Sequence, residues 1–163
     1  MLTHLFTPEQ CAQCKLCCNF QRRSAWETPS LNKELQAALR VMGIPLEERG
    51  DNGACSFRLT YHTTDPSETA NCPMLDTCSG CILPREQRPF ECRIWPLRLM
   101  RTENGQLVLG LYANCPALTE PVKERLITEA TGALLPLLLE HAEKEPAIVR
   151  PVDSAYNIIW RDI

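Results

Sequence analysis

The sequence predicts a small, irregular α+β domain that is rich in cysteine, binds metal, and contains a β-hairpin with flanking α-helices. Three observations support this: ten cysteines among 163 residues, leucines at helical spacing in two stretches, and a hairpin signal between them. A chain of this length buries most of its surface without help, so its cysteines are not needed to stabilise a very small fold. We expect a single domain over residues 1–163, with a cysteine-rich metal-binding region over 11–118 and a C-terminal helical segment, 119–145, packed on it.

The first predicted element after the opening cysteines is a helix. Residues 28–30 (Thr-Pro-Ser) combine a hydroxyl cap with a proline in the first turn. An apolar stripe follows, and Gly43 ends it. The stripe consists of Leu31, Leu35, Leu39 and Met42, and we expect it to be core. Residues 47–69 are polar and carry turn signals at 51–53 and 65–67, which indicates loop or short strands.

A β-hairpin is predicted next. Residues 96–102 and 106–112 flank Asn104-Gly105, which is a strong short hairpin signal. Leucines alternate with other residues along both stretches, so we expect a two-stranded ribbon with one buried leucine face.

An amphipathic helix is predicted from Pro121, with Thr119 or Glu120 near its cap. Gly132 and Pro136 should kink this helix or split it in two. We expect the tail, residues 148–163, to dock Ile158, Ile159 and Trp160 onto the core.

The cysteines open the chain as Cys11-x-x-Cys14-x-x-Cys17-Cys18. The first residues contain neither a basic segment nor an apolar run of signal length, so we expect a cytoplasmic protein whose thiols are reduced. In that compartment metal ligation is the favoured interpretation of the thiols, and disulfides formed after an unrecognised export route are the alternative.

Composition excludes other classes of function. The net charge of −3 argues against a general nucleic-acid binder. The longest apolar run, residues 133–139, is interrupted by Pro136 and is too short to span a membrane. No phosphate-binding glycine loop, Ser/His/Asp arrangement or carboxylate pair indicates catalysis, so catalytic residues stay unknown.

The spacing of the first three cysteines allows three thiolates to reach one centre, as in the opening run of bacterial ferredoxins. Cys72-Pro73 and Cys115-Pro116 have the Cys-Pro form that also occurs in ferredoxins, although not at ferredoxin spacing. Cys17 and Cys18 are adjacent, so we expect their side chains to diverge by about 100° in a helix or to opposite faces in a strand. A distorted turn that aims both sulfurs the same way is the alternative. The pair thus suggests two metal centres or one multinuclear centre, with Cys18 turned toward a different metal atom from Cys11, Cys14 and Cys17.

The second group of cysteines completes a recognisable pattern. Cys-x-x-Cys-x-x-Cys-Cys is followed by Cys-Pro-x-Leu at Cys72, by Cys81, and by Arg-Pro-x-x-Cys-Arg ending at Arg93. This pattern, over residues 11–96, resembles the YkgJ-type cysteine-cluster family, which is described as zinc- or iron-chelating and is similar to the flagellin lysine methylases. The resemblance implies that Arg88, Pro89 and Arg93 accompany a set of metal ligands: Cys11, Cys14, Cys17, Cys18, Cys72, Cys81 and Cys92. The chain departs from the family pattern at several positions, one of which is Lys15, where the family usually has a glycine.

Together with Cys115 these make eight candidate ligands, which divide into four and four and fit one or two thiolate-ligated centres. Cys55 and Cys78 lie outside the pattern. Thiolates suit iron–sulfur clusters and zinc alike. We favour iron–sulfur, such as 4Fe–4S, because Arg88 and Arg93 beside Cys92 can offset a negative cluster. A pair of solvated or backbone-capping arginines is the alternative.

Three functions follow from these candidate ligands. The first is electron transfer, redox sensing or support of a partner enzyme by a cytosolic iron–sulfur protein. The alternatives are a zinc-stabilised protein-interaction module and a lysine N-methylase-like enzyme. If the chain is an iron–sulfur protein, we expect it to have a protein partner.

Overall fold

The computed structural model describes residues 2, 5–49 and 54–162, and only the backbone of Pro8, Glu9 and Cys11. Helices and small, mainly antiparallel sheets alternate along the chain, so the mixed α+β class is confirmed. Where the sequence suggests one domain, the chain divides into two compact units. We call Met1–Phe6 with Ile94–Ile163 the sheet unit, and Thr7–Arg93 the cysteine unit.

The sheet unit contains a four-stranded sheet in the order β10-β8-β7-β9. Its strands are β7 (Leu97–Arg101), β8 (Leu107–Tyr112), β9 (Arg150–Pro151) and β10 (Tyr156–Arg161). The predicted hairpin is confirmed, since β7 and β8 pair antiparallel from Leu97↔Leu111 to Arg101↔Leu107. Gly105 has φ +87° in its turn, a conformation that few other residues adopt easily. The tail also docks as expected, because β10 pairs with β8.

The buried leucine face is confirmed, but the opposite face of the hairpin is buried as well. Arg98 and Met100 are buried between the buried leucines of β7, so both faces of the hairpin are covered. Met100 and Val108 form a second core with Tyr156 from β10. Gly110 makes this packing possible, since a Cβ at this position would lie 2.3 Å from Met100 Cε. Sequence alternation misses the second core because its third side chain comes from the tail.

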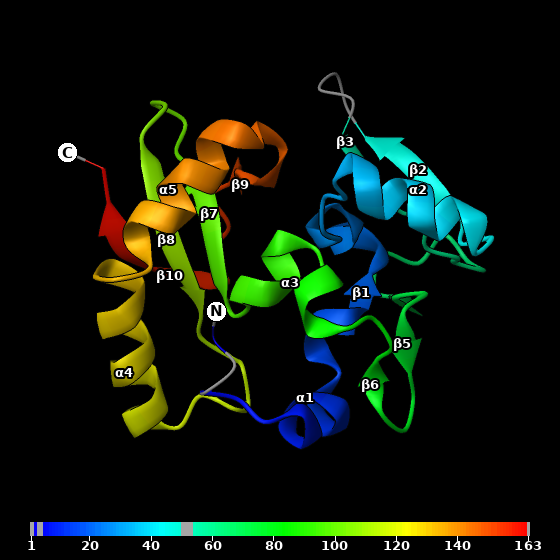
Figure 1. Ribbon diagram of the computed structural model, residues 1–163, viewed down its shortest axis with the longest axis horizontal. Coiled ribbons are helices and arrows are strands. Elements are labelled where there is room, and N and C mark those ends of the chain that lie inside the picture. The colour runs from blue at the N-terminus through cyan, green and yellow to red at the C-terminus, as the bar shows by residue number, and fades with distance from the viewer. Residues whose placement is uncertain (1, 3–4, 50–53, 163) are drawn as a thin grey trace. The chain divides into compact units, whose positions relative to one another are not determined.

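Two helices cover part of the sheet. The long C-terminal helix is split at Gly132, as predicted, into α4 (Glu120–Thr131) and α5 (Leu135–Lys144). Figure 1 shows α5 crossing one face of β7 and β8. A short 3-10 helix, η4 (Pro146–Ile148), follows. Residues 119–145 therefore belong to the sheet unit, and their packing on a metal-binding region stays a prediction.

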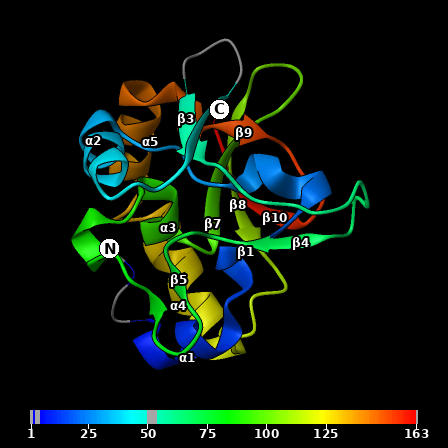
Figure 2. The same ribbon diagram turned by 90° about the vertical axis from the view of Figure 1, so that its right-hand side faces the viewer.

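The cysteine unit contains three two-stranded antiparallel ribbons. They are β1 (Asn19–Gln21) with β4 (Thr69–Asn71), β2 (Leu46–Arg49) with β3 (Ala54–Phe57), and β5 (Leu75–Asp76) with β6 (Gly80–Cys81). Figure 2 shows the β1–β4 ribbon clearly. The prediction of loop or short strands over 47–69 is confirmed. Its turn at 51–53 lies outside the described residues, and Asp65 forms the second turn by accepting a hydrogen bond from the Ser67 backbone.

Short helices connect these ribbons. They are α1 (Pro8–Cys14), η1 (Leu16–Cys18), η2 (Arg22–Glu27), α2 (Lys33–Val41), η3 (Arg85–Gln87) and α3 (Phe90–Ile94). The cap predicted for α2 at residues 28–30 is wrong, since Asn32 caps the helix by accepting from the Leu35 N–H at 2.8 Å. Gly43 ends α2 with φ +73°, as predicted. Met42 is exposed because it lies beyond the last turn that faces the core.

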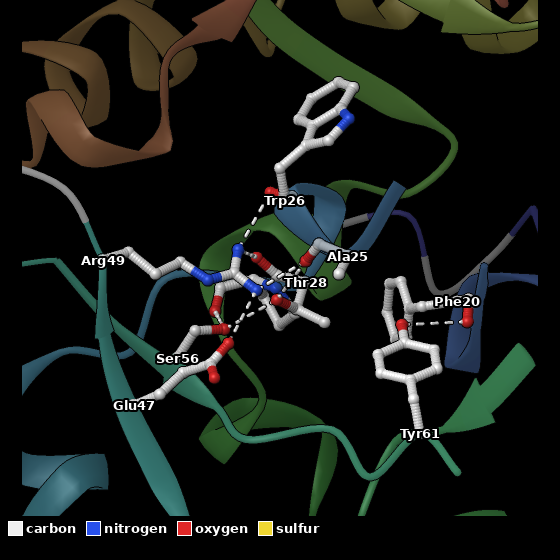
Figure 3. A network of polar contacts seen from close by, with 9 residues as sticks. Phe20, Ala25, Trp26, Thr28, Glu47, Arg49, Ser56 and Tyr61 are labelled. Atoms are coloured by element: carbon white, nitrogen blue, oxygen red, sulfur yellow. Dashed lines mark hydrogen bonds and ion pairs between the residues drawn. The ribbon is translucent and has the colours of Figure 1, made fainter. Parts of the chain in front are cut away.

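A polar network ties η2 to the β2–β3 ribbon, as Figure 3 shows. The Arg49 guanidinium donates to the carbonyls of Ala25, Trp26 and Thr28 at 2.5, 2.9 and 3.2 Å. Ser56, on the partner strand, donates to Thr28 Oγ1 at 2.9 Å. One arginine thus donates to three carbonyls at the end of η2, one of which, that of Ala25, also accepts from the Thr28 N–H at 3.2 Å.

Candidate metal centre

The first two cysteines, Cys11 and Cys14, lie in helix α1, whose start has a clear chemical signature. Thr7 Oγ1 accepts from the Gln10 N–H at 3.2 Å, and Gln10 Oε1 accepts from the Thr7 N–H at 2.9 Å. This capping box, with Pro8 in the first turn, starts α1. Our sequence reasoning missed it, although Thr-x-x-Gln before the cysteines was a usable signal.

Lys15 then turns the chain. It has φ 54° and ψ 3°, the left-handed conformation that glycine favours. The lysine therefore adopts the backbone shape for which the resembled family uses glycine. Its Nζ donates to the carbonyl of Thr77, which ties α1 to the loop of the β5–β6 ribbon.

Cys18 and Cys72 are brought together by the β1–β4 ladder. Asn19 pairs with Asn71, and one position further along the Cys72 N–H donates to the Cys18 carbonyl at 2.7 Å. The Met74 N–H hydrogen-bonds to the Cys72 thiol and acts to lower its pKa. An N–H donor two residues after a cysteine stabilises a thiolate, and such donors tune thiolate-bound metals.

Cys81 lies on β6, where it pairs with Leu75 of β5. The Leu83 N–H hydrogen-bonds to its thiol, two residues on, as Met74 does for Cys72. The ribbon also packs on α1: a Cβ on Gly80 would lie 3.3 Å from Ala12 Cα, and Gly80 has φ +85°. A glycine is thus favoured at this position for two independent reasons.

Cys92 lies on α3, and its N–H donates to the Pro89 carbonyl at 3.0 Å. The neighbouring Glu91 is buried and accepts a hydrogen bond from the Ser30 N–H. This carboxylate anchors α3 to the segment that precedes α2. Nothing in the sequence distinguished Glu91 from a solvated acid.

The charge of Cys18 raises the pKa of three other thiols, those of Cys72, Cys81 and Cys92. Burial raises the pKa of Cys72 to about 12, and the Cys18 and Cys81 thiolates add to that rise. Burial likewise raises the pKa of Cys81, with Cys18 contributing. At Cys92 burial again raises the pKa, and then the charges of Cys18, Cys72, Glu91 and Cys81 raise it further, although the residue retains exposed surface. Four thiols from three segments therefore share one neighbourhood.

Cys18 differs from the other three. A hydrogen bond with Cys17 lowers its pKa, burial opposes this, and the positive charge of Arg88 supports it. Arg88 donates to the carbonyls of Leu83 and Cys81 at 3.1 and 3.3 Å. It is thus a backbone-capping arginine, the alternative considered above, and its charge also lowers the pKa of Cys81. Arg93 lies 5.7 Å from the Phe90 ring centre, and its buried Nε has no hydrogen-bond partner among the described residues.

The expectation that Cys17 and Cys18 diverge is wrong. Their Sγ atoms lie 3.9 Å apart and either thiol can donate. The reason is local: η1 ends at Cys18, and the chain becomes extended at Asn19, with φ −126°. The 100° separation of a continuous helix does not apply at such a junction.

The remaining cysteines fall into three groups. Cys14 is half-buried at the end of α1, and the side chain of Cys11 lies outside the described part. Cys55 is buried on β3, and Cys78 is exposed in the β5–β6 loop. Cys115 is buried in the sheet unit, so the structure does not place it among the four grouped thiols.

Nine cysteines have described side chains, and no disulfide joins them. Within the described ranges, no three Cys, His, Asp or Glu side chains form a group that could hold a metal ion. The same ranges contain no helix long and apolar enough to cross a membrane.

Comparison with known proteins identifies no family model, no curated protein and no solved structure that matches the chain. The resemblance to the YkgJ-type family, which depends on the cysteine pattern, stays a prediction.

Proposed function

We propose that the cysteine unit holds a thiolate-ligated metal centre formed by Cys18, Cys72, Cys81 and Cys92. The observation that carries this proposal is the 2.7 Å hydrogen bond that joins Cys72 to Cys18, beside the effect of the Cys18 charge on the pKa values of Cys72, Cys81 and Cys92. Four sulfur donors are the number that zinc sites and iron–sulfur clusters use. The number and type of donors match such a centre, and the Met74 and Leu83 N–H groups donate to two of the sulfurs. Among the described residues these sulfurs do not form a group that could hold a metal ion, so ligation requires them to move closer together.

The raised pKa values of these thiols indicate how metal binding would change their protonation. Without a cation, Cys72, Cys81 and Cys92 are neutral thiols at neutral pH, because burial disfavours their charged forms. Cys72, Cys81 and Cys92 would lose these protons on ligating a metal, whose positive charge would compensate the buried thiolates, so that metal binding and folding would be coupled. Metal uptake should accordingly release protons.

Among thiolate-ligated centres we favour an iron–sulfur cluster. Arg88 places positive charge beside Cys18 and Cys81, as expected for offsetting a negatively charged cluster. The function that follows is electron transfer, redox sensing or support of a partner enzyme in a reducing compartment such as the cytosol. A protein partner that receives or supplies electrons belongs to this proposal.

The test is anaerobic purification of the full chain, with iron, acid-labile sulfide and zinc counted per molecule. We expect equal amounts of iron and sulfide, and visible charge-transfer absorption that disappears on oxidation. A colourless protein with stoichiometric zinc would replace the electron-transfer function by a zinc-stabilised interaction module. Absence of all three elements would contradict the metal centre itself.

The ligand assignment is tested separately with Cys81→Ser and Cys55→Ser. Cys81→Ser should lose the metal, because it removes one of the four grouped sulfurs. Cys55 is buried on β3 and lies outside the group, so Cys55→Ser is the matched control and should retain the metal. Equal metal content in the two variants would contradict the assignment.

A further inference from the structure

The turn of the β7–β8 hairpin contains a chemically reactive pair of residues, Asn104 and Gly105, which are both exposed to water. The backbone nitrogen that follows an asparagine can attack the side-chain carbonyl carbon, and glycine hinders this attack least because it has no Cβ. A bond then forms between the Gly105 nitrogen and Asn104 Cγ, the nitrogen loses its proton, and the asparagine amide leaves as ammonia. Water opens the resulting succinimide ring to aspartate or isoaspartate.

The closed turn holds both groups that must meet in this reaction. The Gly105 N–H donates to the Thr102 carbonyl at 2.9 Å, so the attacking nitrogen is occupied by a hydrogen bond. The Thr102 hydroxyl donates to Asn104 Oδ1, which ties the carboxamide to the turn, and accepts from the Gln106 N–H at 3.0 Å. On the far side of the glycine, Arg101 Nη1 donates to the Gly105 carbonyl at 2.7 Å. Ring closure therefore requires the turn to open.

We propose that Asn104 is a site of spontaneous deamidation whose rate is set by opening of the β7–β8 turn, which Thr102 holds closed. This inference concerns the sheet unit and goes beyond the proposed function, because the reaction needs only water and no metal. Hairpins form in about 1–10 μs, which is far faster than the loss of ammonia from an amide. The deamidation rate therefore follows the fraction of molecules in which the turn is open.

The products differ from asparagine in charge and in backbone length. Aspartate adds a negative charge to the turn, whereas isoaspartate also adds one carbon atom to the main chain between Cα and the Gly105 nitrogen. The β7–β8 register, from Leu97↔Leu111 to Arg101↔Leu107, depends on the length of the turn. An isoaspartate at this position no longer matches that register, so each modified molecule keeps a permanent record that its hairpin opened.

The experiment incubates the full native chain at mildly alkaline pH and follows deamidation and isoaspartate at Asn104 by peptide mass mapping. Thr102→Ala removes the hydroxyl that ties the carboxamide, and we expect the native rate to rise about two- to tenfold, as loss of one hydrogen bond shifts an opening equilibrium. Thr102→Ser keeps a hydroxyl and should restore the wild-type rate. Thr64→Ala, at an exposed threonine between β3 and β4, is the matched control and should leave the rate unchanged.

Incubation in unfolding urea measures the reactivity of the open chain. All of these proteins should then deamidate at one common rate, at least about tenfold faster than the native wild type. Asn157, which precedes a β-branched isoleucine, is the internal reference and should stay intact throughout. Equal rates for native and unfolded wild type, or an unchanged native rate in Thr102→Ala, would overturn the inference. If Thr102→Ala fails to fold, the wild-type comparison and Thr102→Ser still decide it.

Discussion

The two units of this chain are stabilised by different means. Among the described residues, the twelve largest fully buried side chains include nine from the sheet unit and three from the cysteine unit. The three are Leu39, Phe57 and Met74, whereas the sheet unit buries both faces of the β7–β8 hairpin. The cysteine unit instead uses ribbons of two to four residues per strand, which are marginally stable alone in water.

This difference indicates what each unit needs in order to fold. Apolar burial supplies the sheet unit with stabilisation that needs no ligand. The cysteine unit also has an apolar core, which includes Phe20, Phe57 and Met74, but the thiol of Cys72 is part of that core and Cys18 and Cys81 pack against it. We therefore expect the cysteine unit to depend on metal and the sheet unit to be independent of it.

The largest expected effect is that of metal removal. Chelation under reducing conditions should increase amide hydrogen exchange in the β1–β4 and β5–β6 ribbons by more than about a hundredfold, because ligation and folding are coupled. Amides of β7 and β8 serve as the internal control and should keep their protection. Equal protection of the ribbons before and after chelation would show that the cysteine unit is folded without its metal.

Removal of the Arg49 network should have the next largest effect. Arg49→Met leaves the Ala25, Trp26 and Thr28 carbonyls without this donor, and we expect a loss of about 1–3 kcal/mol in the free energy of unfolding. Urea unfolding of the metal-loaded protein measures this loss of stability. Arg58→Met is the matched control, since Arg58 is exposed next to β3, and it should change stability by less than about 0.5 kcal/mol. Similar losses in both variants would show that the network contributes little.

A smaller effect is expected from the contact between the β5–β6 ribbon and α1. Gly80 and Gly105 have almost the same positive φ, +85° and +87°, but only Gly80 lies against another element. Both alanine substitutions should cost about 1–2 kcal/mol because of the left-handed backbone. Gly80→Ala should cost about 1 kcal/mol more, since Ala12 backbone at 3.3 Å cannot move aside as a side chain can. Equal thermal shifts would mean that the ribbon does not need its close approach to α1.

The sequence predicts the local elements of both units better than it predicts the candidate site. The β7–β8 hairpin, the split at Gly132 and the end of α2 at Gly43 follow from local turn and helix-end chemistry, which operates over a few residues. The second core around Tyr156 was missed because it joins residues about fifty positions apart.

The same limit applies to the thiols. Cysteine spacing identified Cys18, Cys72, Cys81 and Cys92 as candidates, but their grouping depends on ladder register and on the position of α3. The convergence of Cys17 and Cys18 depends on a change of backbone conformation within one residue, which periodicity does not encode. The role of Glu91 depends on its burial, which an isolated acidic residue does not reveal.

The smallest expected effect concerns pH and the loop that leads into β4. The His62 N–H donates to the Glu68 carboxylate and, with the Thr63 hydroxyl and N–H, lowers the pKa of Glu68 to about 2 from its ordinary value of 4.5. A carboxyl whose pKa is lower in the folded state stabilises the fold above its ordinary pKa, and this contribution is lost as the pH falls from about 4.5 to about 2. Because Glu68 is only partly buried, solvent screening keeps the effect local. We expect the His62 and Thr63 amides to exchange faster over that pH range, with Glu68→Gln abolishing the change. A Glu68 carboxyl that titrates near 4.5 in an NMR experiment would show that the loop does not hold it.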